Sequence, residues 1–119
     1  MTKTFHEHCA EAKKNIKECS VKDVMKMMID NEDFALVDIR EDNEFNKGKI
    51  KGAIHIGKGI IERDIHLHTP DHDKKIVLYC GGGYRSVLAA ESLQKMGYTN
   101  VISMNGGWKG WNAGGGEVE

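Results

Sequence analysis

The first apolar residues of the chain recur at helical spacing. Intervals of four, three and four residues separate Phe5, Cys9, Ala12 and Ile16. With lysines and glutamates between them, these positions predict an amphipathic helix over residues 5–17. A second helix is predicted after Ser20, because Asp23 follows it by three residues as in a capping box and the apolar positions Val24, Met27 and Met28 come next.

Short apolar runs later in the chain predict buried strands. They lie at 34–39, 53–56, 76–79 and 101–103. Their continuous apolar character is typical of strands covered on both faces in a parallel sheet. Helical segments are predicted at 41–47, 60–64, 87–96 and 108–112, with a polar connection at 66–75 that holds the only proline. Strands that alternate with helices indicate an α/β fold with a mostly parallel sheet.

The length of 119 residues fits one domain with a core of its own. We expect an N-terminal helical extension at 1–19, the α/β domain at 20–113 and a flexible glycine-rich tail at 114–119. The formal net charge of −1 argues against nucleic acid or a membrane surface as partner. We find neither an apolar stretch long enough to span a membrane nor a signal peptide, and an odd number of cysteines fits a reducing compartment, so the expected location is cytoplasmic.

The segment that carries chemistry is the glycine-rich loop after the third apolar run. Its sequence is Cys80-Gly81-Gly82-Gly83-Tyr84-Arg85-Ser86. A strand that enters a glycine turn and then a helix directs several backbone N–H groups and the positive end of the helix dipole toward one point. A cysteine at that point ionises readily, because the thiolate is the form that these donors stabilise. The alternative is a buried cysteine that only packs at a strand end.

The other loop residues suggest a binding site for an anion. Arg85 offers a fork of donors for an anionic group, and Ser86 adds a hydroxyl. Tyr84 is expected at the rim of the pocket, while Gly81, Gly82 and Gly83 supply backbone amides. The alternative for Arg85 is an ordinary surface charge with no part in binding. Asp38 and Arg40 stand at the end of a predicted strand, where the carboxyl ends of parallel strands meet a binding crevice.

Taken together, these blocks resemble the rhodanese family, in particular its single-domain sulfurtransferases. The resemblance covers about residues 20–111 and rests on three segments: Leu36 to Arg40 with Glu44-Phe45, Gly52-Ala53-Ile54 with Ile56, and Cys80 to Ser86 with Gly106-Gly107-Trp108 and Trp111 downstream. It implies a three-layer α/β fold, a central mostly parallel sheet flanked by helices. It also implies a Cys80 persulfide and no cofactor or metal, with Asp38 and Arg40 chiefly structural and the tryptophans as core anchors.

The implied partners are a small sulfur donor, thiosulfate or a persulfide, and a thiophilic acceptor such as cyanide, a thiol or a protein cysteine. The chain departs from the family pattern in three places. Lys49 replaces a common histidine, Lys58 replaces a common arginine, and Gly81-Gly82 leave the loop without an extra basic residue. The last change favours a persulfide donor over thiosulfate.

Three other readings compete with this one. A cysteine phosphatase or arsenate reductase has five residues between cysteine and arginine, whereas four separate Cys80 from Arg85. A sulfur-relay or regulatory module would act only with a protein partner, docked through the N-terminal helix. Metal binding is the weakest alternative: the clusters His6-His8-Cys9 and His66-His68-His72 lack the spacing of a structural zinc site.

Overall fold

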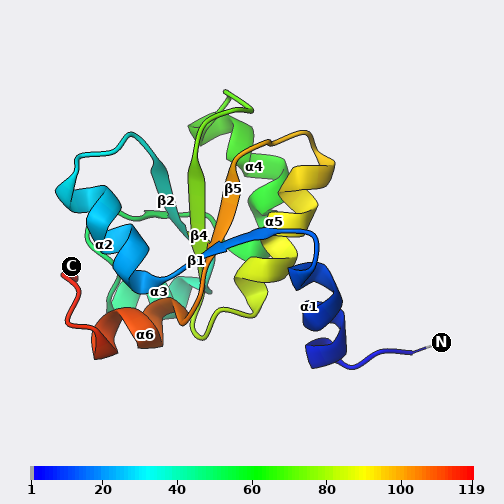
Figure 1. Ribbon diagram of the computed structural model, residues 1–119, viewed down its shortest axis with the longest axis horizontal. Coiled ribbons are helices and arrows are strands. Elements are labelled where there is room, and N and C mark those ends of the chain that lie inside the picture. The colour runs from blue at the N-terminus through cyan, green and yellow to red at the C-terminus, as the bar shows by residue number, and fades with distance from the viewer. Residues whose placement is uncertain (1) are drawn as a thin grey trace.

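The computed structural model describes residues 2–119 and contains one five-stranded sheet in which every strand is parallel to its neighbours (Figure 1). The strand order is β1-β5-β4-β2-β3. The strands are β1 Lys17–Cys19, β2 Ala35–Asp38, β3 Ile54–His55, β4 Ile76–Tyr79 and β5 Val101–Met104. The helices are α1 Phe5–Lys13, α2 Val21–Ile29, α3 Asp42–Lys47, the 3-10 turn η1 Lys58–Ile60, α4 Ile61–His68, α5 Arg85–Lys95 and α6 Gly107–Ala113. The predicted α/β fold with a central parallel sheet is confirmed.

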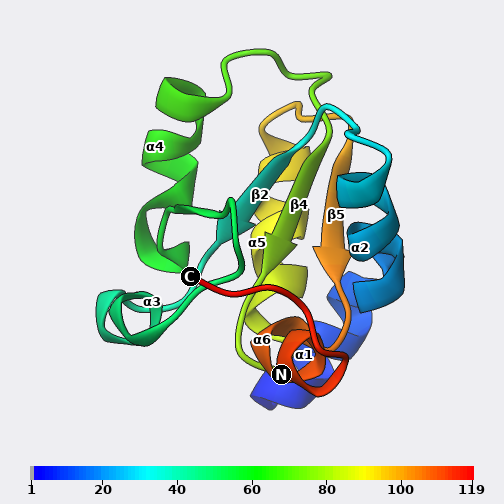
Figure 2. The same cartoon turned by 90° about the vertical axis from the view of Figure 1, so that its left-hand side faces the viewer.

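Helices cover both faces of the sheet and give the fold three layers. One core cluster packs sheet residues such as Val37 and Leu78 against side chains of α4 and α5, with Ile16 at its edge. The other packs residues such as Val77 and Tyr79 against α2 and Trp111 of α6. Figures 1 and 2 show α2 and α6 on one side of the strands and α4 and α5 on the other. The fully buried run of β4 is explained by its place in the middle of the sheet.

The helix predicted over residues 5–17 ends earlier, at Lys13. Lys17–Cys19 form the edge strand β1, which pairs with β5 and brings part of the expected extension into the sheet. Two of its three residues are charged and exposed. A short polar edge strand of this kind has no apolar alternation to reveal it, and charge at an edge discourages pairing with another chain.

Two further segments differ from expectation. Helix α4 continues to His68, into the predicted polar connection, because Ile61 and Ile65 one turn apart are both buried against the core. Residues 117–119 run antiparallel to residues 49–51, with backbone hydrogen bonds between Lys49 and Glu119 in both directions. The indole N–H of Trp111 also donates to the Glu117 carbonyl at 2.9 Å. The segment that the sequence predicts to be a flexible tail thus makes hydrogen bonds to the domain.

Candidate active site

Cys80 follows the last residue of the central strand β4, at the carboxyl edge of the sheet. Its side chain is 1% exposed, and its sulfur accepts a hydrogen bond from the Gly83 backbone N–H at 3.2 Å. The thiol lies 3.7 Å from the Ser86 hydroxyl, which pairs in turn with Ser103 of β5 at 2.8 Å. Because helix α5 begins at Arg85, the sulfur lies beside the start of that helix, where backbone N–H groups favour negative charge.

The shape of the loop depends on contacts with α6. The backbone N–H groups of Trp108 and Lys109 donate to the carbonyls of Cys80 and Gly81, at 2.7 and 3.1 Å. Gly107 has φ +54°, and a Cβ there would lie 2.3 Å from the Cys80 carbonyl oxygen. Only glycine permits so close an approach of the two backbones. Gly106-Gly107 therefore shape the site from a distance of more than twenty residues in sequence.

Arg85 forms a two-point ion pair with Glu44 of α3. Its Nη1 and Nη2 donate to the two carboxylate oxygens at 3.0 and 3.3 Å, and both side chains are about one third exposed. The pairing lowers the pKa of Glu44, chiefly through the hydrogen bond from Arg85. It also raises the pKa of Arg85, to which the neighbouring Cys80 contributes less. The ion pair with Glu44 thus fixes the Arg85 side chain in the lining of the pocket.

Asp38 and Arg40 form a second ion pair, which is buried. The guanidinium meets the Asp38 carboxylate through Nε and Nη2, with a shortest distance of 2.7 Å, and Nη2 also donates to the Gly48 carbonyl at 2.6 Å. Tyr79 donates its hydroxyl to Asp38 at 2.6 Å, and the indole ring of Trp108 lies 4.6 Å from the guanidinium carbon. Burial and the hydrogen bond to Asp38 raise the pKa of Tyr79. The network ties β2, β4 and the segment before β3 together.

Helix α1 supplies one side of the pocket around Cys80. Phe5 lines it, together with Glu44, Lys109 and the loop residues Cys80, Gly81, Gly82, Tyr84 and Arg85. The pocket has a volume of about 390 Å³. The Tyr84 ring lies 6.2 Å from Phe5 and 5.0 Å from His6, centroid to centroid. The buried Cys9 thiol donates to the Tyr84 carbonyl at 3.7 Å, and burial, with a smaller contribution from Cys80, raises the pKa of Cys9.

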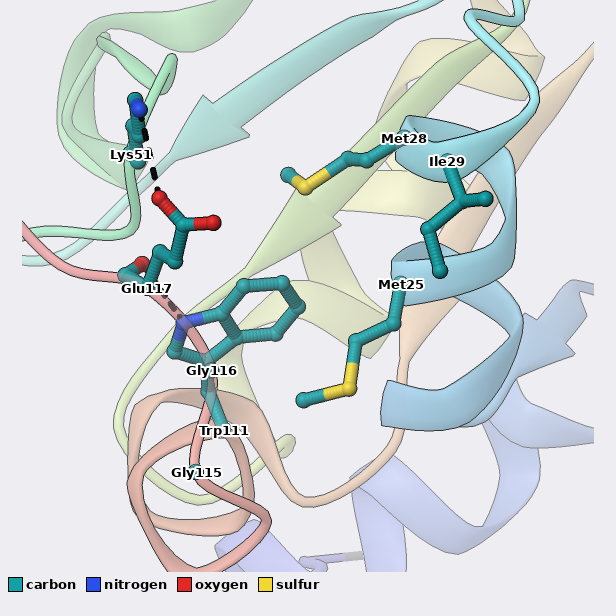
Figure 3. A pocket seen from close by; sticks show the side chains of 8 residues that line it. All are labelled: Met25, Met28, Ile29, Lys51, Trp111, Gly115, Gly116 and Glu117. Atoms are coloured by element: carbon teal, nitrogen blue, oxygen red, sulfur yellow. Dashed lines mark hydrogen bonds and ion pairs between the residues drawn. The ribbon is translucent and has the colours of Figure 1, made fainter.

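A second pocket, of about 290 Å³, lies away from this site, between α2 and the C-terminal segment (Figure 3). Met25, Met28 and Trp111 give it an apolar lining, and Lys51 and Glu117 form an ion pair at 3.2 Å on one side. Its lining holds no cysteine or histidine. Cys80 lines the other pocket.

The predicted site residues fall into two groups. Cys80, the glycines 81–83, Tyr84, Arg85 and Ser86 are brought together by one loop, whereas Asp38 and Arg40 make their contacts with the buried network. Sequence reasoning missed Phe5, Glu44 and Lys109 as lining residues. Glu44 belongs to one of the segments that resemble the rhodanese family. Its ion pair with Arg85 depends on the tertiary structure, and no local sequence pattern predicts it. Lys49 lies over the Phe45 ring at 4.8 Å, outside the pocket lining.

Within residues 2–119, no group of three or more histidine, cysteine, aspartate or glutamate side chains is placed to hold a metal ion. In the same range no helix is both long and apolar enough to cross a bilayer. The chemistry that the site offers is a thiol at a glycine loop with an amide donor on its sulfur and an arginine nearby. This arrangement supports attack by a thiolate and retention of an anionic product.

Curated relatives of similar length carry sulfurtransferase names. The putative sulfurtransferase YtwF of Bacillus subtilis is 34% identical over 81% of this chain and 90% of its own. The thiosulfate sulfurtransferase GlpE of Shewanella oneidensis is 32% identical over 82% of this chain and 94% of its own. Three further relatives are longer, and the chain spans only 56% to 62% of their length.

A solved structure from Rhodopseudomonas palustris matches the whole chain. It has a TM-score of 0.88 and 31% identity, and the match covers 100% of this chain and 96% of the other. That protein is described as one of unknown function and a possible tyrosine phosphatase. The family profile of the rhodanese-like domain matches residues 20–114. With this match, the relatives and the fold in agreement, the chain belongs to the rhodanese-like domain family.

Proposed function

We propose that this protein is a sulfurtransferase that carries a sulfane sulfur as a persulfide on Cys80. The observation that carries the proposal is the short contact from the Gly83 N–H to the Cys80 sulfur, in a pocket that also contains Arg85. The sulfurtransferase names of relatives at 32% to 34% identity support it. Cys9, Cys19 and Cys80 are all free thiols, which supports a reducing compartment such as the cytoplasm.

The cycle has two transfers and needs no external oxidant. The Cys80 thiolate attacks the outer sulfur of thiosulfate, a new sulfur–sulfur bond forms, and sulfite leaves with the electron pair of the old one. With a persulfide donor, the leaving group is a thiolate. An acceptor then attacks the outer sulfur of the Cys80 persulfide, and the cysteine leaves as thiolate. With cyanide as acceptor the product is thiocyanate.

The neighbouring groups have distinct parts in this cycle. Backbone amides of the loop stabilise the charge on the terminal sulfur, as the Gly83 N–H already does for Cys80. Two N–H groups of Arg85 are engaged by Glu44, and its remaining donors serve the anionic group of an incoming donor. Cys80 needs no general base within the pocket once it is ionised, so Tyr84 acts as a wall and not as a proton acceptor.

The description of the R. palustris protein as a possible tyrosine phosphatase makes phosphate-ester hydrolysis the second candidate. One observation argues against it here. Four residues separate Cys80 from Arg85, which leaves a smaller loop than the phosphatase arrangement of five. Sulfur transfer is therefore the function that the site supports better.

Thiocyanate formation from thiosulfate and cyanide tests the proposal, with release of nitrophenol from its phosphate ester measured beside it. We expect wild type to form thiocyanate and Cys80→Ser to form none, while both leave the phosphate ester intact. The matched control is Cys19→Ser, which removes a thiol that is not part of the pocket lining. Thiocyanate formation by Cys80→Ser at the rate of wild type contradicts the proposal. Hydrolysis of the phosphate ester that occurs in wild type and is absent from Cys80→Ser also contradicts it.

A further inference from the structure

Helix α1 lies before the segment that the family profile matches, yet it completes the pocket at Cys80. The profile begins at residue 20, whereas α1 spans Phe5–Lys13. The helix is anchored by Cys9, which is 1% exposed and donates its thiol to the Tyr84 carbonyl. Its first turn then places Phe5 and His6 against the Tyr84 ring. We call the three rings of Phe5, His6 and Tyr84 the aromatic wall.

The aromatic wall is accessible where it meets the pocket. Phe5 is 48% exposed and Tyr84 is 45% exposed, and both line the cavity that holds Cys80. Exposed aromatic rings beside a reactive group are a costly arrangement in water unless something covers them in use. Their place in the same cavity as the sulfur indicates that the covering group belongs to the molecule that reacts there.

The charges of the pocket disfavour a small dianion as that molecule. Arg85 is matched by the carboxylate of Glu44, which lines the same cavity. Lys109 is the remaining cation of the lining, and no carboxylate of residues 2–119 pairs with it. The pocket thus offers one uncompensated positive charge and a large aromatic surface. A sulfur bonded to an apolar carbon group fits this combination better than a sulfonate does.

We propose that the aromatic wall binds the carbon substituent of a low-molecular-weight organic thiol, used as sulfur acceptor or, in its persulfide form, as donor. This inference rests on the proposed function. Phe5 is then a specificity-determining residue contributed from outside the family-matched segment. A cavity of about 390 Å³ lies in the range of small-molecule sites, which favours a small thiol over a protein.

Sulfur transfer between Cys80 and the organic thiol exchanges one sulfur–sulfur bond for another in either direction. The organic thiolate attacks the outer sulfur of the Cys80 persulfide, a bond forms between the thiol sulfur and that sulfur, and the bond to the cysteine breaks. Cys80 leaves as thiolate, and the product is the organic persulfide. The reverse step loads Cys80 from that persulfide. Since the same substituent occupies the site in both directions, the aromatic wall serves donor and acceptor alike.

The test compares two thiols of different substituent on full-length protein. Cys80 is loaded with thiosulfate or polysulfide, the excess is removed, and single-turnover transfer to 2-phenylethanethiol and to 2-mercaptoethanol is measured. We expect Phe5→Ala to lower the ratio of the two rate constants by about fivefold, the scale of one lost aromatic contact. Phe5→Tyr, which keeps a ring, should retain the ratio. Alanine is a good helix former, so α1 remains in the variant.

The matched control is Leu67→Ala, which removes an apolar side chain that is 70% exposed on α4 and outside the pocket lining. Its ratio should equal that of wild type. An unchanged ratio in Phe5→Ala overturns the inference and leaves the proposed function standing. Failure of wild type to take up sulfur on Cys80 overturns both. A third arm uses a blocked tripeptide with a central cysteine: if only this acceptor depends on Phe5, the inference of a small thiol is overturned.

Discussion

Two arginine–carboxylate pairs stand near the carboxyl edge of the same sheet, and their surroundings differ. In the Asp38–Arg40 pair the side chains are 0% and 3% exposed, with Tyr79 and Trp108 around them. In the Glu44–Arg85 pair they are 35% and 32% exposed, and both line the pocket of Cys80. The comparison teaches that burial, and not the type of pair, decides whether such a contact serves the fold or remains available to a ligand.

The largest effect is expected from breaking the buried pair. Asp38→Ala leaves the Arg40 guanidinium buried without its carboxylate and removes the acceptor of the Tyr79 hydroxyl. We expect a loss of about 3–5 kcal/mol in the free energy of unfolding, measured by urea denaturation. The double variant Asp38→Leu/Arg40→Met removes both charges and should recover part of that loss. A loss below about 1 kcal/mol in Asp38→Ala would place this pair in the same class as the exposed one.

The next largest effect concerns activity at the exposed pair. Arg85→Ala removes the N–H groups that we propose bind an anionic sulfur donor, so we expect kcat/KM for thiosulfate to fall about thirtyfold, or about 2 kcal/mol. Its free energy of unfolding should stay within about 1 kcal/mol of wild type. Lys26→Ala, which breaks an ion pair on α2 outside the pocket lining, is the control and should leave kcat/KM unchanged. A stability loss as large as that of Asp38→Ala would remove the distinction between the pairs.

The smallest effect is the pH dependence of the exposed pair. Pairing lowers the pKa of Glu44 below its ordinary value of 4.5, so the contact contributes stability above that pH and loses it as the pH falls through the lower pKa of the folded state. The stability difference between wild type and Glu44→Gln should therefore be below about 1 kcal/mol at pH 7 and shrink further below pH 4.5. Urea denaturation across pH 7 to 3 measures it, and a difference that grows in acid would contradict this sign.

Features carried by contiguous residues could be predicted from the sequence, and features that depend on distant contacts could not. The loop from Cys80 to Ser86 could be predicted as a candidate site because its residues are contiguous and form a strand end, a glycine turn and a helix start. The contribution of Phe5 was missed because it depends on how α1 packs beside α5, a contact across about 80 residues of sequence. Strand β1 escaped notice because its polar residues gain their structure only from pairing with β5.

The central claim is that Cys80 carries the transferred sulfur, and the intact mass of the protein tests it most directly. Wild type and Cys80→Ser are incubated with thiosulfate, and their intact masses are measured by mass spectrometry before and after addition of cyanide. The account predicts a gain of one sulfur atom on wild type alone, lost on addition of cyanide with release of thiocyanate. A gain of one sulfur on the Cys80→Ser variant equal to that on wild type, or none on wild type with either thiosulfate or polysulfide, would contradict it.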